Sequence, residues 1–260
     1  MIFYFSATGN SQYVASRLSA GTNEEMVSIT DCMKSGRLRF SMKPEEAVGI
    51  VSPTYFLELP AIVCDFLEKA EFLPEGKLYV YFAATYGTTC GSSGSVVNAY
   101  MARKGFPLDA RFSVKMPDSW TPIFDLSDEA HVGKINEAAE PQIDDVVRRV
   151  QARECGDFMK LRLPAFAGRI YYKNYDKQRT TDHFRVEDSC VGCGLCAGNC
   201  PVDAIEMQDG KPVWTSEKCL ACLGCLHRCP KFSIQYGDKT KRHGQYRNPH
   251  VLNESEEGRS

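Results

Sequence analysis

The sequence predicts an α/β domain with a doubly wound, five-stranded parallel sheet, followed by a small α+β domain rich in cysteine. Short apolar runs, typical of buried strands, alternate with segments of helical periodicity up to residue 153. Of the 12 cysteines in the chain, eight fall between positions 190 and 229. Alternating strands and helices build a parallel sheet that is covered on both faces, whereas clustered cysteines build a local metal or redox site. We therefore expect two different domains.

The first domain is expected over residues 1–153. Its expected strands are residues 2–5, 26–29, 47–51, 78–84 and 108–114. Its expected helices are residues 11–18, 61–67, 96–104 and 135–150, where apolar side chains recur at helical spacing. The segment 30–46 lacks a clear pattern, so the crossover helix there should be short or irregular.

Composition narrows the class of protein. The chain has 260 residues with 31 Lys and Arg against 33 Asp and Glu, a formal charge of −2 that argues against a strongly basic nucleic-acid binder. No apolar run approaches the roughly 20 residues of a membrane-spanning helix, and the first apolar run is too short for a secretory signal. We therefore expect a cytoplasmic protein whose fold starts at residue 1, with cysteines that serve metal or redox chemistry rather than disulfides.

Two further boundaries follow from changes in composition. Residues 154–185 are expected to connect the domains, and this basic segment contains RIYYKNYDK. Such a composition could suit nucleic acid, but no RNA or DNA module motif accompanies it, so we expect a linker whose tyrosines pack on both domains. The second domain is expected over residues 186–237. A polar tail over residues 238–260 should follow the surface and then fray.

Two copies of one cysteine motif lie in the second domain. CVGCGLCAGNCP starts at Cys190 and CLACLGCLHRCP starts at Cys219, and both read C-x2-C-x2-C-x3-C-P. Thiolates at this spacing converge on a soft metal centre, and the fourth cysteine of each copy binds the other cluster. The expected ligands are Cys190, Cys193, Cys196 and Cys229 for one [4Fe-4S] cluster, and Cys200, Cys219, Cys222 and Cys225 for the second.

Structural zinc sites are the alternative, since they also use C-x2-C pairs. Zinc sites seldom present C-x2-C-x2-C followed by C-P twice, so we favour iron and sulfur. The region from residue 186 to residue 236 resembles bacterial-type two-cluster ferredoxins over the full length of their motif.

The turn after the first strand, SATGNS at residues 6–11, is rich in hydrogen-bond donors. It lies where the first helix should point its backbone N–H groups outward, a location that favours an anion. No Lys or Arg occurs up to residue 12, so the turn differs from the G-K-[ST] loop of nucleotide triphosphatases. An ordinary helix cap would explain only one or two of the hydroxyl groups. The expected ligands of a single phosphate are Ser6, Thr8, Gly9, Asn10 and Ser11.

This turn, S-x-T-G-N-S, resembles the FMN phosphate loop of flavodoxins. The resemblance implies FMN as cofactor and two further loops that hold the flavin ring beyond the carboxyl ends of the strands. The candidates are SPTYFLELP from residue 52, with Tyr55 on the ring face, and ATYGTTCGSSGS from residue 84. The implied contacts are Pro53, Thr54, Tyr55, Thr85, Tyr86, Gly87, Cys90 and Gly91. Cys90 is expected to be a packing residue rather than a nucleophile. Neutral donors alone would leave the phosphate charge uncompensated and lower the flavin potential.

The two halves together, with an MPDSW loop and a GQYRNP tail, resemble the fused flavodoxin and ferredoxin proteins of the EFR1 family. The resemblance implies electron transfer in anaerobic metabolism, with redox proteins as unidentified partners. An alternative is a flavin-dependent reductase of a small organic substrate, with residues 116–126 closing over the ring and Trp120, Pro122 and Phe124 forming an apolar pocket. A redox sensor is a third possibility, but no output module is recognisable.

Overall fold

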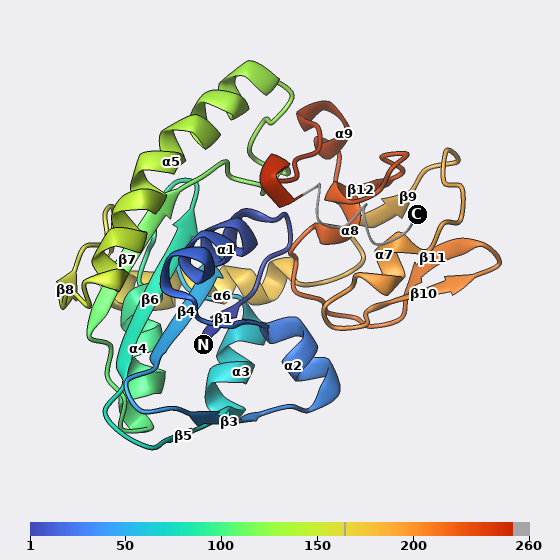
Figure 1. The fold of residues 1–260 in the computed structure, drawn as a ribbon. Coiled ribbons are helices and arrows are strands. Elements are labelled where there is room, and N and C mark those ends of the chain that lie inside the picture. The colour runs from blue at the N-terminus through green and yellow to red at the C-terminus, as the bar shows by residue number, and fades with distance from the viewer. Residues whose placement is uncertain (164, 252–260) are drawn as a thin grey trace.

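One parallel sheet organises the first part of the chain (Figure 1). Its strands lie in the order β2 (Met26–Ser28), β1 (Ile2–Tyr4), β4 (Ala47–Pro53), β6 (Tyr79–Tyr86), β7 (Ala110–Lys115) and β8 (Gly156–Asp157). All neighbouring strands pair in parallel. The five expected strands are present, and the two-residue strand β8 extends the edge next to β7. The direction of winding reverses between β1 and β4, which creates a topological switch point at their carboxyl ends.

Helices cover both faces of this sheet. The helices α1 (Asn10–Thr22) and α5 (Glu129–Gln151) pack on one face, where Val14, Leu18 and Ile143 join a core with β1 and β7. On the other face, α3 (Ala61–Lys69) and α4 (Ser93–Arg103) bury Phe66 and Val97. Every residue of β6 is buried, as expected for a central strand of a sheet that is covered on both sides.

The crossover from β2 to β4 is the irregular one, as its sequence predicts. Its helix α2 (Ile29–Ser35) has only seven residues. The strand β3 (Arg39–Met42) then leaves the main sheet and pairs with β5 (Glu71–Pro74) in a separate two-stranded sheet.

The second part of the chain consists of two small antiparallel sheets and short helices. The strand β9 (Phe184–Val186) pairs with β12 (Ile234–Tyr236), and β10 (Ile205–Gln208) pairs with β11 (Lys211–Trp214). The helices α7 (Leu195–Gly198) and α8 (Gly224–His227) occupy equivalent positions in the two cysteine motifs, and α9 (Thr240–His243) follows. The duplication in the sequence is therefore a structural duplication as well, and the α/β and α+β classes are both confirmed.

The structure, a computed structural model, describes residues 1–163 and 165–251. The last nine residues of the predicted tail lie outside these ranges. Among the described residues, no helix has the length and apolar character needed to cross a membrane.

The segment predicted as a connector contains a helix of 14 residues, α6 (Ala165–Gln178). Two of its tyrosines bind both halves of the chain. The Tyr172 hydroxyl donates to the carbonyl of Leu59 at 2.8 Å. The Tyr175 hydroxyl donates to the carbonyl of Leu220 at 2.8 Å and accepts from the N–H of Ala61 at 3.4 Å. The expectation that tyrosines of this segment pack on both domains is therefore confirmed.

We predict that Tyr175→Phe lowers the free energy of unfolding by about 1–2 kcal/mol, because the buried Leu220 carbonyl would lose its partner. Urea unfolding of the full chain under anaerobic conditions measures this change. Tyr171→Phe is the matched control, since Tyr171 lies on the same helix and is 45% exposed; it should change stability by less than about 0.5 kcal/mol. Equal effects of the two substitutions would contradict the prediction.

Candidate functional site

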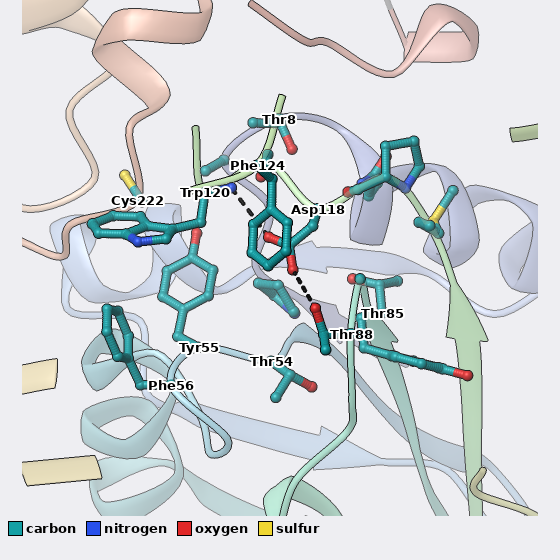
Figure 2. Close-up of a pocket in the computed structure, with 18 of the residues that line it drawn as sticks. Thr8, Thr54, Tyr55, Phe56, Thr85, Thr88, Asp118, Trp120, Phe124 and Cys222 are labelled. Carbon is teal, nitrogen blue, oxygen red and sulfur yellow. Dashed lines mark hydrogen bonds between the residues drawn. The ribbon is translucent and has the colours of Figure 1, made fainter. Parts of the chain in front are cut away.

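A cavity of about 350 Å³ opens at the carboxyl ends of β1, β4 and β6, where the switch point lies (Figure 2). Its wall comes from the loops that follow these strands, from residues 116–120 after β7, and from Ala221 and Cys222 of the second domain. The predicted cofactor-binding residues that line it are Ser6, Thr8, Asn10, Ser11, Pro53, Thr54, Tyr55, Thr85, Tyr86 and Gly87. The two halves of the chain therefore share one cavity.

Three predicted cofactor-binding residues, Gly9, Cys90 and Gly91, lie behind this wall and not in it. Gly91 has a φ of 54°, and a Cβ atom there would meet the carbonyl oxygen of Leu57 at 2.0 Å, so the glycine lets the second and third loops touch. The thiol of Cys90 donates to the carbonyl of Lys160 at 3.1 Å. Burial raises the pKa of Cys90 to about 11, which suits the predicted packing role.

The predicted phosphate loop, residues 6–11, is ordered by its own hydroxyl groups and by a neighbouring cation. Ser6 Oγ accepts from the N–H of Gly9 at 3.1 Å, and the hydroxyls of Ser11 and Thr85 lie 2.8 Å apart. The loop itself supplies only neutral donors, as predicted. Arg228 of the second domain, however, donates from Nε to the carbonyl of Ala7 at 3.2 Å. A positive charge therefore lies beside this loop, contrary to the expectation that nothing compensates a phosphate there.

The second loop makes a tight turn at Phe56 and Leu57. Two backbone hydrogen bonds of 3.0 and 2.9 Å join Tyr55 and Glu58, and the two residues between them have φ values of 48° and 70°. This left-handed conformation usually requires Asn or Gly, so the turn stores strain of roughly 1–2 kcal/mol per residue. Packing compensates for it, because the ring of Phe56 stacks on Tyr175 with centroids 5.3 Å apart. Phe56 thus forms an aromatic rim of the cavity that the sequence did not reveal.

The loop after β7 places a carboxyl group in the cavity (Figure 2). Asp118 accepts hydrogen bonds from the N–H of Trp120 at 3.2 Å and from the hydroxyl of Thr88 at 3.3 Å. Burial raises the pKa of this carboxyl above its usual value. A Cβ atom at Gly87 would lie 2.2 Å from Asp118 Cβ, so only glycine leaves room for this loop to close. Asp118 was missed, although it stands inside the MPDSW motif.

Trp120 and Phe124 also line the cavity, whereas Pro122 does not. The indole of Trp120 meets the rings of Phe56 and Tyr236, each with centroids 5.4 Å apart. Since Tyr236 belongs to the second domain, this aromatic wall is held in place by both halves of the chain.

The cavity fits a flavin mononucleotide in its chemistry. The hydroxyl oxygen Oγ1 of Thr54 is buried at the cavity wall and has no hydrogen-bond partner among the described residues. A buried polar atom without a partner is costly, and a polar ring edge would supply the missing bond. Tyr55 and Trp120 offer flat apolar surface at the same wall, while the hydroxyl-rich loop offers donors for a phosphate.

The eight motif cysteines surround two small cavities in the two sets that the sequence predicts. One cavity is lined by Cys190, Cys193, Cys196 and Cys229. The other is lined by Cys200, Cys219, Cys222 and Cys225. Within residues 1–163 and 165–251, no three His, Cys, Asp or Glu side chains lie close enough to share a single metal ion.

The chemistry of both small cavities suits iron–sulfur clusters. Backbone N–H groups of Ala204, Ala221 and Ser233 donate to cysteine sulfurs at 3.2–3.3 Å. Such bonds stabilise clusters. Burial raises the pKa of Cys222 to about 12. A thiolate at that position therefore needs a cationic centre such as iron to compensate its charge.

The two cysteine loops share an unusual backbone. Gly192 and Gly194 in the first copy have positive φ values, and so do Ala221 and Leu223 at the equivalent places in the second copy. The second copy keeps this conformation without glycine. Its loop is the one that packs against the large cavity, where Ala221 forms part of the wall.

Histidine side chains fasten the loop after β7 to the second domain. His227 is buried, and its Nε2 lies 2.9 Å from the carbonyl of Ser119, while its Nδ1 accepts from the N–H of Tyr246 at 3.1 Å. This pattern fixes the tautomer that carries a proton on Nε2. His243 makes a similar contact of 2.7 Å with the carbonyl of Thr121. The loop after β7, which covers the cavity, is therefore bound to the cysteine-rich half.

Comparison with known proteins finds two families, each of which matches a different part of the chain. Residues 1–145 match the flavodoxin domain, and residues 183–230 match the 4Fe-4S dicluster domain. An uncharacterized polyferredoxin-like protein of Methanocaldococcus jannaschii is 39% identical over 62 residues, which cover 19% of this chain and 37% of that protein. One component of the Na(+)-translocating ferredoxin:NAD(+) oxidoreductase complex of Acetobacterium woodii is 46% identical over 43 residues, or 16% of this chain and 13% of that component.

Two further similarities cover only parts of the proteins compared. A ferredoxin of Clostridium butyricum is 62% identical over 26 residues, which are 10% of this chain and 47% of the ferredoxin. The chain thus spans less than half the length of each of these three relatives. The solved structure of rubredoxin oxygen:oxidoreductase from Desulfovibrio gigas aligns with 58% of this chain and 36% of its own, with a TM-score of 0.35 and 16% identity.

We predict that Gly87→Ala weakens flavin binding at least about tenfold, because the new methyl group would push Asp118 and its loop away from the cavity. Titration of the full chain with FMN, followed by flavin fluorescence, measures the dissociation constant. Gly133→Ala is the control, since Gly133 lies in α5 and its added Cβ would meet no other described part of the chain within 4 Å beyond its own helix backbone. An unchanged dissociation constant in Gly87→Ala would contradict the geometry described here.

A second prediction concerns iron. Cys222→Ala should reduce the iron content of the anaerobically reconstituted chain from about eight to about four atoms, because it removes a ligand from one set only. Cys90→Ala, at a buried cysteine outside both sets, should leave the content at about eight. Zinc in place of iron, or equal iron in Cys222→Ala and the unaltered chain, would refute the ligand sets.

Proposed function

The chain belongs to the flavodoxin-domain family, and we propose that it relays low-potential electrons between two [4Fe-4S] clusters and FMN bound in the large cavity. The match to the 4Fe-4S dicluster domain and the ferredoxin relatives support an electron-transfer role. In this proposal residues 1–153 form the flavodoxin-like domain, 154–185 the connector, 186–237 the ferredoxin-like domain and 238–260 the tail. We also propose membership of the fused EFR1 group, and a cytoplasmic place in anaerobic metabolism, on the resemblance described above.

The position of Cys222 is the observation that carries this proposal. Cys222 lines the small cavity of the second cysteine set and also the large cavity at the end of the sheet. When bound, the clusters would exchange single electrons and FMN one or two. Since Cys222 belongs to both sites, electrons could pass from one site to the other through a single residue. In the proposed relay, the second set is therefore the inner set, the one next to the flavin.

The first cysteine set has the character of an outer station. Its Cys193 is exposed, and the neighbouring Val191 is 61% exposed. None of its members lines the large cavity. A redox protein that approaches this surface would reach the first set before the second. We propose that the donor or acceptor protein, whose identity is open, docks here.

Residues around the inner set adjust the electrostatics of the relay. Arg228 contacts Ala7 of the phosphate loop. Together with Cys222 it also lines another cavity, which is polar, has a volume of about 270 Å³ and lies between the halves. The positive charge of Arg228 favours negative charge both at a phosphate in the loop and at a sulfur ligand of the second cysteine set. Asp118 acts in the opposite sense, since a carboxylate in the large cavity opposes added negative charge there.

A reductase of a small organic substrate is the second candidate function. The observation that favours it is the half-buried carboxyl of Asp118 beside the apolar walls of Trp120 and Phe124. A raised pKa favours the protonated carboxyl, which is the form that can donate a proton to a bound acceptor. The test is turnover of an added organic acceptor. Loss of turnover in Trp120→Ala, together with normal turnover in Arg242→Ala at an exposed position, would support this candidate.

The relay is tested by comparing two cysteine variants that each lose one cluster. Flash photoreduction of the anaerobically reconstituted chain should be followed by flavin reduction, observed as loss of the flavin absorption band. Cys222→Ala should slow this transfer at least about tenfold, because it removes the ligand that the two sites share. Cys193→Ala is the matched variant and should leave transfer from the inner set intact. Equal slowing in the two variants would contradict the proposed order.

A further inference from the structure

The described end of the chain, residues 244–251, reaches the phosphate loop at Asn248. Figure 1 shows this red segment beside the start of α1. The backbone N–H of Asn248 donates to the carbonyl of Thr8 at 2.8 Å. Gly9, whose φ is 97°, faces the same residue, and a Cβ atom added there would meet Asn248 Cβ at 2.9 Å. Glycine at position 9 therefore makes room for the tail segment, residues 244–251.

A chain of hydrogen bonds runs from the backbone of the tail segment to Asn10. The N–H of His250 donates to Asn248 Oδ1 at 3.1 Å, and a backbone N–H can only donate. The amide of Asn248 must therefore turn its Nδ2 the other way, where it donates to Asn10 Oδ1 at 3.1 Å. The hydroxyl of Tyr246 also lies 2.7 Å from this oxygen. These contacts fix which end of the Asn10 amide is oxygen.

The fixed orientation decides what Asn10 can offer to a ligand. Since Oδ1 faces the tail segment, Nδ2 faces the loops of the cavity, where it donates to the carbonyl of Pro117 at 3.3 Å. The Asn10 amide carries a second N–H, and Asn10 lines the cavity. Asn10 and Asn248 are 8% and 1% exposed, so water does not compete with this network. With the amide reversed, Asn10 would present an oxygen to an anion.

The tail segment is also anchored to the cysteine-rich half. Gln245 donates from Nε2 to the carbonyls of Leu226 at 2.6 Å and Cys229 at 2.9 Å. The N–H of Tyr246 donates to His227 Nδ1 at 3.1 Å. The segment is thus held at both ends of its path, by the second cysteine motif and by the phosphate loop.

We propose that Tyr246 and Asn248 are positioning residues of the phosphate subsite, which hold the Asn10 amide with its N–H group toward the phosphate and so select FMN over riboflavin. This inference rests on the proposed function, because it assumes FMN in the large cavity. It assigns to the C-terminal tail a role in cofactor recognition by the N-terminal domain. The two residues act through Asn10 and do not themselves line the cavity.

The test compares FMN with riboflavin, which lacks the phosphate. We expect Asn248→Ala to weaken FMN binding about 3- to 10-fold and to leave the riboflavin dissociation constant unchanged, because only the phosphate contact loses its oriented donor. Asn248→Asp keeps the shape of the side chain but cannot donate to Asn10 Oδ1, so it should be at least as harmful to FMN binding. Flavin fluorescence titration of the reconstituted full chain measures both constants.

Controls separate this inference from the proposed function. Asn174→Ala, at an exposed position of α6, should alter neither constant. The iron content of each variant, unchanged from the unaltered chain, shows that the fold is intact. Equal losses for FMN and riboflavin, or no loss in either Asn248 variant, would overturn the inference alone. An unaltered chain that binds neither flavin would instead overturn the proposed function.

Discussion

The architecture depends on one contact, in which the loop of the second cysteine motif packs against the carboxyl end of the parallel sheet. Leu220 is buried in the same core as Phe5 and Phe82 of the first domain. The next residues, Ala221 and Cys222, form part of the cavity wall. Because this loop carries a thiol of the inner set, the packing of one apolar side chain fixes the distance between two candidate cofactor sites. The chemistry that we propose follows from this contact.

Polar contacts fix the orientation of the two halves around this apolar contact. Arg228 reaches the carbonyl of Ala7, His227 that of Ser119, and Tyr175 bridges Leu220 and Ala61. The bonds to Ala7, Ser119 and Leu220 engage backbone groups of loops that border the cavity. A backbone partner leaves the side chains of those loops available for a ligand. The second domain thus both covers the cavity and shapes its loops.

The local features of the chain could be predicted from the sequence, while contacts between distant segments could not. The cysteine sets follow from spacing within two short motifs, and the composition of SATGNS predicts a phosphate loop. Ala7 and Arg228 are 221 positions apart, and the sequence pattern of neither segment indicates that they are in contact. Helix α6 was missed because the side chains that it packs at Tyr172 and Tyr175 are tyrosines among basic residues, a pattern that is typical of a solvated segment. Phe56 gave no signal, since left-handed turns usually contain Asn or Gly.

The most direct test of the central claim is X-ray diffraction from crystals of the reconstituted chain, with anomalous data at the iron absorption edge. The account predicts two iron centres, one of them bound to Cys222 and in contact through it with a flavin at the carboxyl ends of β1, β4 and β6. A flavin remote from both iron centres, or metal at the Cys222 set that is not iron, would contradict it.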